Sequence, residues 1–184
     1  MALERKKLTT QRFVISRLIE VVDARDRVIG AMPLSEAHRQ SVLHRAVAVL
    51  AFFPGRRLFL FKRPAGALRY AGRFDVSCAG HVNMGESREE TAWRLAGEKL
   101  PFRVDGLAEQ GLVQASHHTG HAFISVFTAR AATGALPPRP LLESLGTVVT
   151  AEEFALLLAE FRDLLTPGLV HMHECGRLFP DERH

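Results

Sequence analysis

The chain has 184 residues, of which 47% are hydrophobic and 24% charged, a balance typical of one folded domain with a sizeable core. No run of about 18 or more apolar residues occurs, which excludes a membrane-spanning helix. The basic N-terminus lacks the apolar stretch of a secretory signal, so we expect a cytoplasmic protein. The net charge of +4 suits an anionic partner such as a phosphate compound, or reflects a general excess of arginine. One Trp and one Tyr argue against an aromatic-lined nucleic-acid groove.

Local patterns predict an N-terminal arm followed by one domain of strands and helices. The arm covers residues 1–16, and residues 17–184 form the domain. We expect a hairpin at 18–33, a helical or looped connection at 35–44, strands at 45–53, 56–63 and 74–82, a helix at 88–99, strands at 109–116 and 122–130, an exposed linker at 132–142, a helix at 151–165, and a polar tail. This order favours a mixed α/β sandwich over a regular alternation of strands and helices.

Both expected helices begin at a capping box, in which a hydroxyl and a carboxylate three residues apart satisfy free backbone amides. Ser87 and Glu90 form the first box, and Thr150 and Glu153 form the second. In the second helix, apolar residues at 154, 157, 158, 161 and 165 form a stripe that we expect to be buried against the sheet.

The stretch GHVNMGESREETAWRLAGEKLPF at 80–102 carries the most specific motif. Gly80, Glu86, Arg94 and Glu98 follow one another at intervals that match the Nudix box. From about Leu18 to Leu169 the chain resembles the Nudix family, which implies an α/β/α sandwich around a mixed sheet. In that family, carboxylates of the box helix and a backbone carbonyl hold Mg²⁺ against a pyrophosphate, because Mg²⁺ prefers oxygen ligands.

The resemblance assigns candidate roles to several residues. The implied Mg²⁺ ligands are Gly80, Glu86, Glu90 and Glu98, with Glu98 and His81 as the catalytic groups. However, the family has glutamate at the positions of Leu95 and Lys99, so the ion is expected to bind weakly or not at all. Glu90, Arg94 and Glu98 also have the spacing of an ordinary ion-pair ladder on a helix surface.

The implied ligand is a small organic diphosphate, and four side chains are candidates for binding it. Arg63 and Arg69 precede the box in a basic loop, which is either a phosphate-binding segment or a solvated surface. We expect Lys99 to replace part of the metal's charge by contacting Glu86 or a phosphate, although it could equally extend into solvent. His121 shares a strand face with Phe123 and Phe127 if the alternation begins there.

A narrower resemblance is to the isopentenyl diphosphate isomerase branch of the Nudix family. It rests on SEAHRQSVLHRAVAVL, FKRP and RYAGRFDVSCAGHVNMGES. The branch uses a cysteine two residues before the histidine that His81 matches, but here Cys78 stands one position earlier and would point to the opposite face.

The second metal site of the isomerases is also incomplete in the sequence. Its two glutamates would fall near Gly120 and Ala122, and His38 and His44 are one residue closer together than in the branch. Lys99 also replaces the box glutamate that the isomerases retain. We therefore expect no isomerase activity.

Two histidine-rich segments and the overall function stay open at this level. HHTGH, with His117, His118 and His121, is either a transition-metal site completed by His81 or a polar turn. HMHECG near the C-terminus is a metal knuckle or a polar tail. The protein is expected to hydrolyse an organic pyrophosphate, to bind a nucleotide or protein as a silent Nudix domain, or to act on an isoprenoid diphosphate. A homodimer is also left open.

Overall fold

The computed structural model describes residues 17–132 and 138–180. The predicted N-terminal arm, residues 1–16, lies outside the described residues. No helix within the described residues is long and apolar enough to cross a membrane.

A mixed sheet is organised around β3 (His44–Phe53), which pairs along its whole length with β8 (Ala122–Ala131) in parallel. On its other edge β3 pairs antiparallel with β6 (Cys78–His81) and with β4 (Arg57–Lys62). Five further strands complete the sheet within the described residues: β1 (Leu18–Val22), β2 (Val28–Pro33), β5 (Phe74–Asp75), β7 (Val104–Val113) and β9 (Gly146–Val149). The predicted mixed sheet is confirmed.

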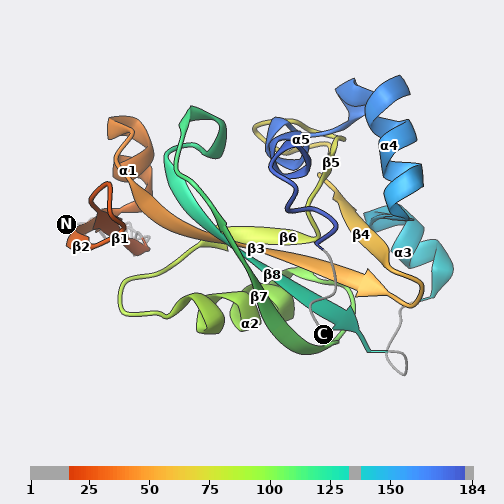
Figure 1. The fold of residues 1–184 in the computed structure, drawn as a ribbon, viewed down its shortest axis with the longest axis horizontal. Coiled ribbons are helices and arrows are strands. Elements are labelled where there is room, and N and C mark those ends of the chain that lie inside the picture. The colour runs from red at the N-terminus through yellow and green to blue at the C-terminus, as the bar shows by residue number, and fades with distance from the viewer. Residues whose placement is uncertain (1–16, 133–137, 181–184) are drawn as a thin grey trace, which may run out of the picture.

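Each face of the sheet is covered by helices, as the alternating side chains of β3 require. Val47, Val49 and Ala51 pack against α2 (Arg88–Lys99). Ala48 and Leu50 point the other way, into a core that includes residues of α4 (Ala151–Glu160) and α5 (Pro167–Glu174). Figure 1 shows α2 on one side of β3 and α5 and α1 (Leu34–Gln40) on the other. This is the α/β/α sandwich expected from the sequence.

Most expected elements are present, and α2 has the predicted bounds and capping box. The single strand expected at 74–82 is instead two short strands, β5 and β6, because the Ser77 hydroxyl between them bonds the backbone of Ala51 and Phe59. Part of the expected linker is α3 (Arg139–Leu145), which begins after Pro138 with proline at its first turn. The remainder of that linker includes residues 133–137, outside the described part of the chain.

The helix expected at 151–165 ends at residue 160, and Phe161 is exposed rather than part of the buried stripe. Its continuation is broken because Thr166 bonds the Phe74 carbonyl through its amide and starts a new helix with Pro167 in the first turn. Helical geometry is also disfavoured at Thr166, because the ring of Pro167 clashes with the backbone of the residue before it. The C-terminal segment expected as a polar tail therefore contains α5, whose Leu169, Val170 and Met172 are buried.

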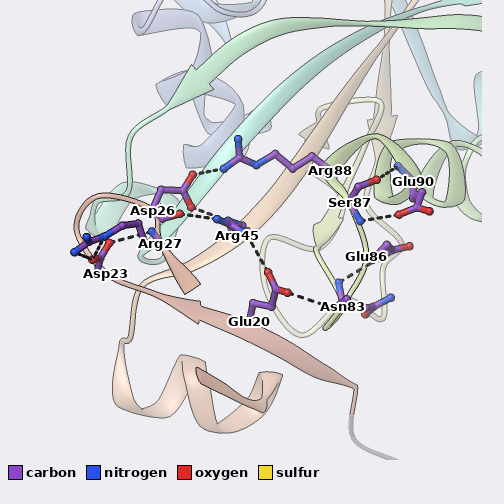
Figure 2. Close-up of polar contacts among 11 residues, drawn as sticks. Glu20, Asp23, Asp26, Arg27, Arg45, Asn83, Glu86, Ser87, Arg88 and Glu90 are labelled. Atoms are coloured by element: carbon purple, nitrogen blue, oxygen red, sulfur yellow. Dashed lines mark hydrogen bonds and ion pairs between the residues drawn. The ribbon is translucent and has the colours of Figure 1, made fainter. Parts of the chain in front are cut away.

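A polar network fastens the N-terminal hairpin to the segment that precedes α2 (Figure 2). Arg45 donates to Asp26 Oδ1 at 2.7 Å and to Glu20 Oε2 at 3.0 Å, and its side chain is only 21% exposed. The other Asp26 oxygen accepts from Arg88 at the start of α2. Glu20 in turn accepts from the amide of Gly85 at 3.4 Å. The network fixes the loop 82–87 from two sides.

Candidate functional site

The first box glutamate is held by the box arginine. Glu86 accepts from Arg94 Nε at 2.6 Å and Nη2 at 2.8 Å, and from the Asn83 amide at 3.2 Å. This paired arrangement lowers the pKa of Glu86 to about 2, mainly through the Arg94 hydrogen bond. Both carboxylate oxygens are thus engaged in fixing the loop to α2. A metal ion at Glu86 would have to share them with Arg94.

The remaining box carboxylates do not converge on one point. Glu90 is used in the helix cap, where it accepts from the Ser87 amide at 2.8 Å. Glu98 is partly exposed and pairs with Arg94 at 3.5 Å and with Arg17 at 4.0 Å. Of the ladder considered for Glu90, Arg94 and Glu98, only the pairing of Arg94 with Glu98 is present among the described residues. The assignment of Glu86, Glu90 and Glu98 as Mg²⁺ ligands stays a prediction without support from their contacts.

Apolar and cationic groups occupy the place where the family's metal would contact the box glycine. Leu95 is buried beneath Gly80, so close that a Cβ on Gly80 would lie 2.6 Å from Leu95 Cδ2. Lys99 Nζ, from the last turn of α2, donates a hydrogen bond to the carbonyl oxygen of Ala79. Burial lowers the pKa of Lys99. Within the described residues, Lys99 is hydrogen-bonded to the Ala79 carbonyl and not to Glu86, the partner expected for it, because Arg94 already occupies that carboxylate.

Three histidines converge on the opposite face of β6. His81 ends β6, His44 begins β3, and His38 reaches them from α1, with ring centroids 4.9 to 5.4 Å apart. His38 Nε2 and His81 Nε2 are 3.1 Å apart, and all three rings place a nitrogen within 4.8 Å of the other two. His44 is buried while His38 is exposed, so the cluster opens toward solvent on the side of α1.

The protonation of the cluster suits metal binding. His44 Nδ1 lies 2.9 Å from the Val42 carbonyl, which can only accept, so this nitrogen carries the proton and Nε2 keeps its lone pair. That Nε2 is buried and has no hydrogen-bond partner. Burial, with smaller contributions from His44, His38 and Lys99, lowers the pKa of His81 to about 3. Burial also lowers the pKa of His44. Both rings are therefore neutral near pH 7.

These three imidazoles fit a transition-metal ion better than Mg²⁺. Neutral imidazole is a ligand for Zn²⁺, Fe²⁺, Co²⁺ and Ni²⁺, whereas Mg²⁺ prefers oxygen ligands. Three histidines with a further coordination position open are also the ligand set of many catalytic zinc sites. The orphaned lone pair of His44 Nε2 is the observation that favours an ion here, because a buried unpaired polar atom is costly without a partner.

The cysteine next to the cluster faces away from it. Cys78 is 4% exposed and packs with Leu95 in the core beneath α2, and burial raises the pKa of its thiol to about 12. Ala79, which alternates with it along β6, is exposed and shares the His81 face. Cys78 therefore lies on the face of the strand opposite His81, as the alternation of side chains predicts. Ala122 lies opposite His44 in the sheet and offers no ligand atom.

The candidate phosphate-binding residues differ in whether their side chains already bond to other parts of the fold. Arg63 is committed to the fold, since it donates to Asp75 Oδ2 and to the Arg69 carbonyl, both at 3.0 Å. The side chain of Arg69 is exposed. His121 precedes β8 and has a φ of 65°, so it does not continue the alternation to Phe123 and Phe127 on which its expected position depended. Its carbonyl accepts from the His44 amide at 3.2 Å.

Comparison with known proteins agrees with the fold. The chain is 34% identical over 149 residues to the isopentenyl-diphosphate Delta-isomerase of Nocardia farcinica, covering 77% of this chain and 85% of the relative. The chain belongs to the Nudix family, in its isopentenyl-diphosphate-isomerase-like branch. It is also 35% identical over 83 residues to an uncharacterized Nudix hydrolase of Streptomyces coelicolor, covering 45% of this chain and 46% of the relative. No family model matches it.

A solved structure supports the same architecture for this Nudix chain. DR0079 from Deinococcus radiodurans superposes with a TM-score of 0.61 over 78% of this chain and 90% of its own, at 21% identity. DR0079 is described as a hypothetical Nudix protein. At this identity the likeness concerns the fold.

Sequence reasoning identified His81 but set aside His38 and His44. The sequence feature that could have identified them is their spacing, which differs by only one residue from the isomerase pattern. The structure places His38 on a helix and His44 on a strand, joined by a turn in which Ser41 is left-handed. Such a turn can absorb a one-residue change in length while both rings still reach His81.

Proposed function

We propose that this protein hydrolyses an organic diphosphate, such as a nucleoside-diphosphate-linked compound, with a transition-metal ion held by His38, His44 and His81. The carrying observation is the buried, unpartnered Nε2 of His44 beside the other two rings. An ion bound there would polarise a phosphoryl oxygen and lower the pKa of a bound water toward neutrality.

The surrounding residues support hydrolysis over isomerisation. Proton transfer at carbon would need an acid or base beside His81, and the neighbouring position on that face is Ala79, while Cys78 is in the core. Hydrolysis needs a positioned water and neutralisation of phosphate charge. The exposed side chain of Arg69 can supply a guanidinium to the anionic ligand.

Lys99 takes over part of the role of the lost box metal in this proposal. Its ammonium lies against the Ala79 carbonyl next to Gly80, where it provides a fixed positive charge beneath β6. Diphosphate binding should then depend weakly on Mg²⁺. Calorimetric titration of a nucleoside diphosphate tests this: Lys99→Met should weaken binding, and chelation of Mg²⁺ should not abolish it.

Turnover is tested with metal-free protein reloaded separately with Zn²⁺, Mn²⁺ and Mg²⁺. Phosphate or monophosphate release is measured over a panel of organic diphosphates, with His81→Asn as the test variant and His173→Asn as a control on α5. We expect turnover with a transition metal in wild type and in the control, and none in His81→Asn. Tight binding without turnover under every metal would favour the silent-domain alternative.

A further inference from the structure

The two histidine-rich segments that are separated in sequence come together in space. A short 3₁₀ turn at His117–Thr119 lies between β7 and β8, and α5 packs against it. The rings of His118 and His171 are stacked, with centroids 5.0 Å apart and an interplanar angle of 26°. The ring of His117 also lies against that of His118, with centroids 3.7 Å apart. Neither segment belongs to the three-histidine cluster described above.

A thiol completes this surface group. Cys175 follows the last residue of α5, is exposed, and lies one helical turn after His171. Its Sγ is 3.7 Å from His171 Nε2. Two ligands that bind one tetrahedral ion at about 2.0 to 2.3 Å are roughly 3.5 Å apart. The His171 and Cys175 pair therefore already has the separation that a shared ion requires.

We propose that His118, His171 and Cys175 form a second metal site, for a borderline or soft ion of the Zn²⁺ class. Thiolate together with imidazole selects such ions over Mg²⁺ and Ca²⁺. His118 is exposed, so its ring can turn from the stacked position toward the ion at small cost. His117, whose ring lies against that of His118, is the neighbouring candidate for a fourth ligand, since the carboxylate of Glu174 is paired with Arg162. Binding releases the thiol proton to solvent, since the thiolate is the ligand.

Backbone and side-chain hydrogen bonds fix the turn that carries His118. The turn that carries His118 is closed by reciprocal bonds between Ser116 and Thr119, at 2.9 and 3.0 Å. It continues directly into His121, whose carbonyl bonds the His44 amide. An ion at the second site would link α5 to this turn and so restrain the segment beside His44.

Cobalt spectroscopy tests the proposal, because a thiolate bound to Co²⁺ gives a near-ultraviolet charge-transfer band that imidazole ligands do not give. The three-histidine cluster contains no thiol, and Cys78 is the sole other cysteine in the sequence and lies in the core. We expect the band in wild type, its complete loss in Cys175→Ser, and at least tenfold weaker Co²⁺ affinity in His118→Gln and in His171→Gln. The charge-transfer band should persist in His81→Asn and in Cys78→Ala.

Three results would overturn the site. These are absence of the band in wild type, its survival in Cys175→Ser, or an unchanged affinity in His118→Gln. Sedimentation with Co²⁺ provides a further check, since a site formed between two copies would dimerise the protein, which also contradicts the proposal. As a second measurement, Zn²⁺ should slow alkylation of Cys175 by iodoacetamide in wild type at least tenfold, and not in His171→Gln.

Discussion

Leu95 packs directly under Gly80, and the space between them leaves no room for even a Cβ on the glycine. This contact region is part of a hydrocarbon core that also contains Cys78 and Ala92. At this position the box helix therefore stabilises the fold through apolar packing.

This packing predicts that restoring the family's glutamate will destabilise the protein. Leu95→Glu should lower the free energy of unfolding by about 3 kcal/mol, because a carboxylate would replace a buried apolar side chain. Leu95→Met, which conserves volume, should cost less than about 1.5 kcal/mol. Urea unfolding measures both. Equal stability of Leu95→Glu and wild type would show that the region is open to solvent.

The Glu86–Arg94 pair predicts a specific acid sensitivity. The hydrogen bond from Arg94 lowers the folded-state pKa of Glu86 to about 2, from an ordinary value of 4.5. The pair therefore stabilises the fold fully above pH 4.5, and this contribution is lost as the pH falls toward 2, by on the order of 2 to 3 kcal/mol. Unfolding measured at several pH values should show this loss in wild type. Glu86→Gln should have a lower free energy of unfolding at pH 6. Between pH 4.5 and 2, its free energy of unfolding should change less with pH than that of wild type.

The network around Arg45 predicts that one carboxylate links the hairpin to the box loop. Asp26→Asn should cost about 1 to 3 kcal/mol, because it weakens the pairing of both Arg45 and Arg88, which are mostly shielded from solvent. The exposed pair Arg139–Glu143 is the matched control, and Arg139→Ala should cost less than about 0.5 kcal/mol. Similar costs for both variants in thermal unfolding would contradict the proposed role of the network.

The two arginines of the loop before β5 should separate stability from ligand binding. Arg63→Ala removes the bond to Asp75 and should lower the melting temperature. Any weakening of diphosphate binding in this variant should result from the loosened loop. Arg69→Ala should leave the melting temperature within about 1 °C while weakening diphosphate binding at least fivefold, since an exposed guanidinium contributes little to folding. Calorimetry and thermal unfolding on the same samples make the comparison. Unchanged affinity in Arg69→Ala would remove this residue from the proposed site.

The local parts of the structure could be predicted from the sequence because they depend on contacts between near neighbours. The capping box of Ser87 and Glu90 set the start of α2, and the apolar run of β3 identified a buried strand. Alternation along β6 placed Cys78 on the face opposite His81. The end of α4 was missed because it depends on a distant contact, the bond of the Thr166 amide to Phe74.

By itself, the sequence determined the Nudix fold and the side of its strand on which Cys78 lies, since both follow from residue identity at a fixed spacing. Only the tertiary structure decided which histidines act together. His38, His44 and His81 come from three elements up to 43 residues apart, and they meet because β6 pairs with β3 and α1 folds back over their ends. His118 and His171 meet because α5 packs against the turn at His117–Thr119. Spacing along the chain does not encode such meetings, because side chains from separate elements are brought together by strand pairing and helix packing.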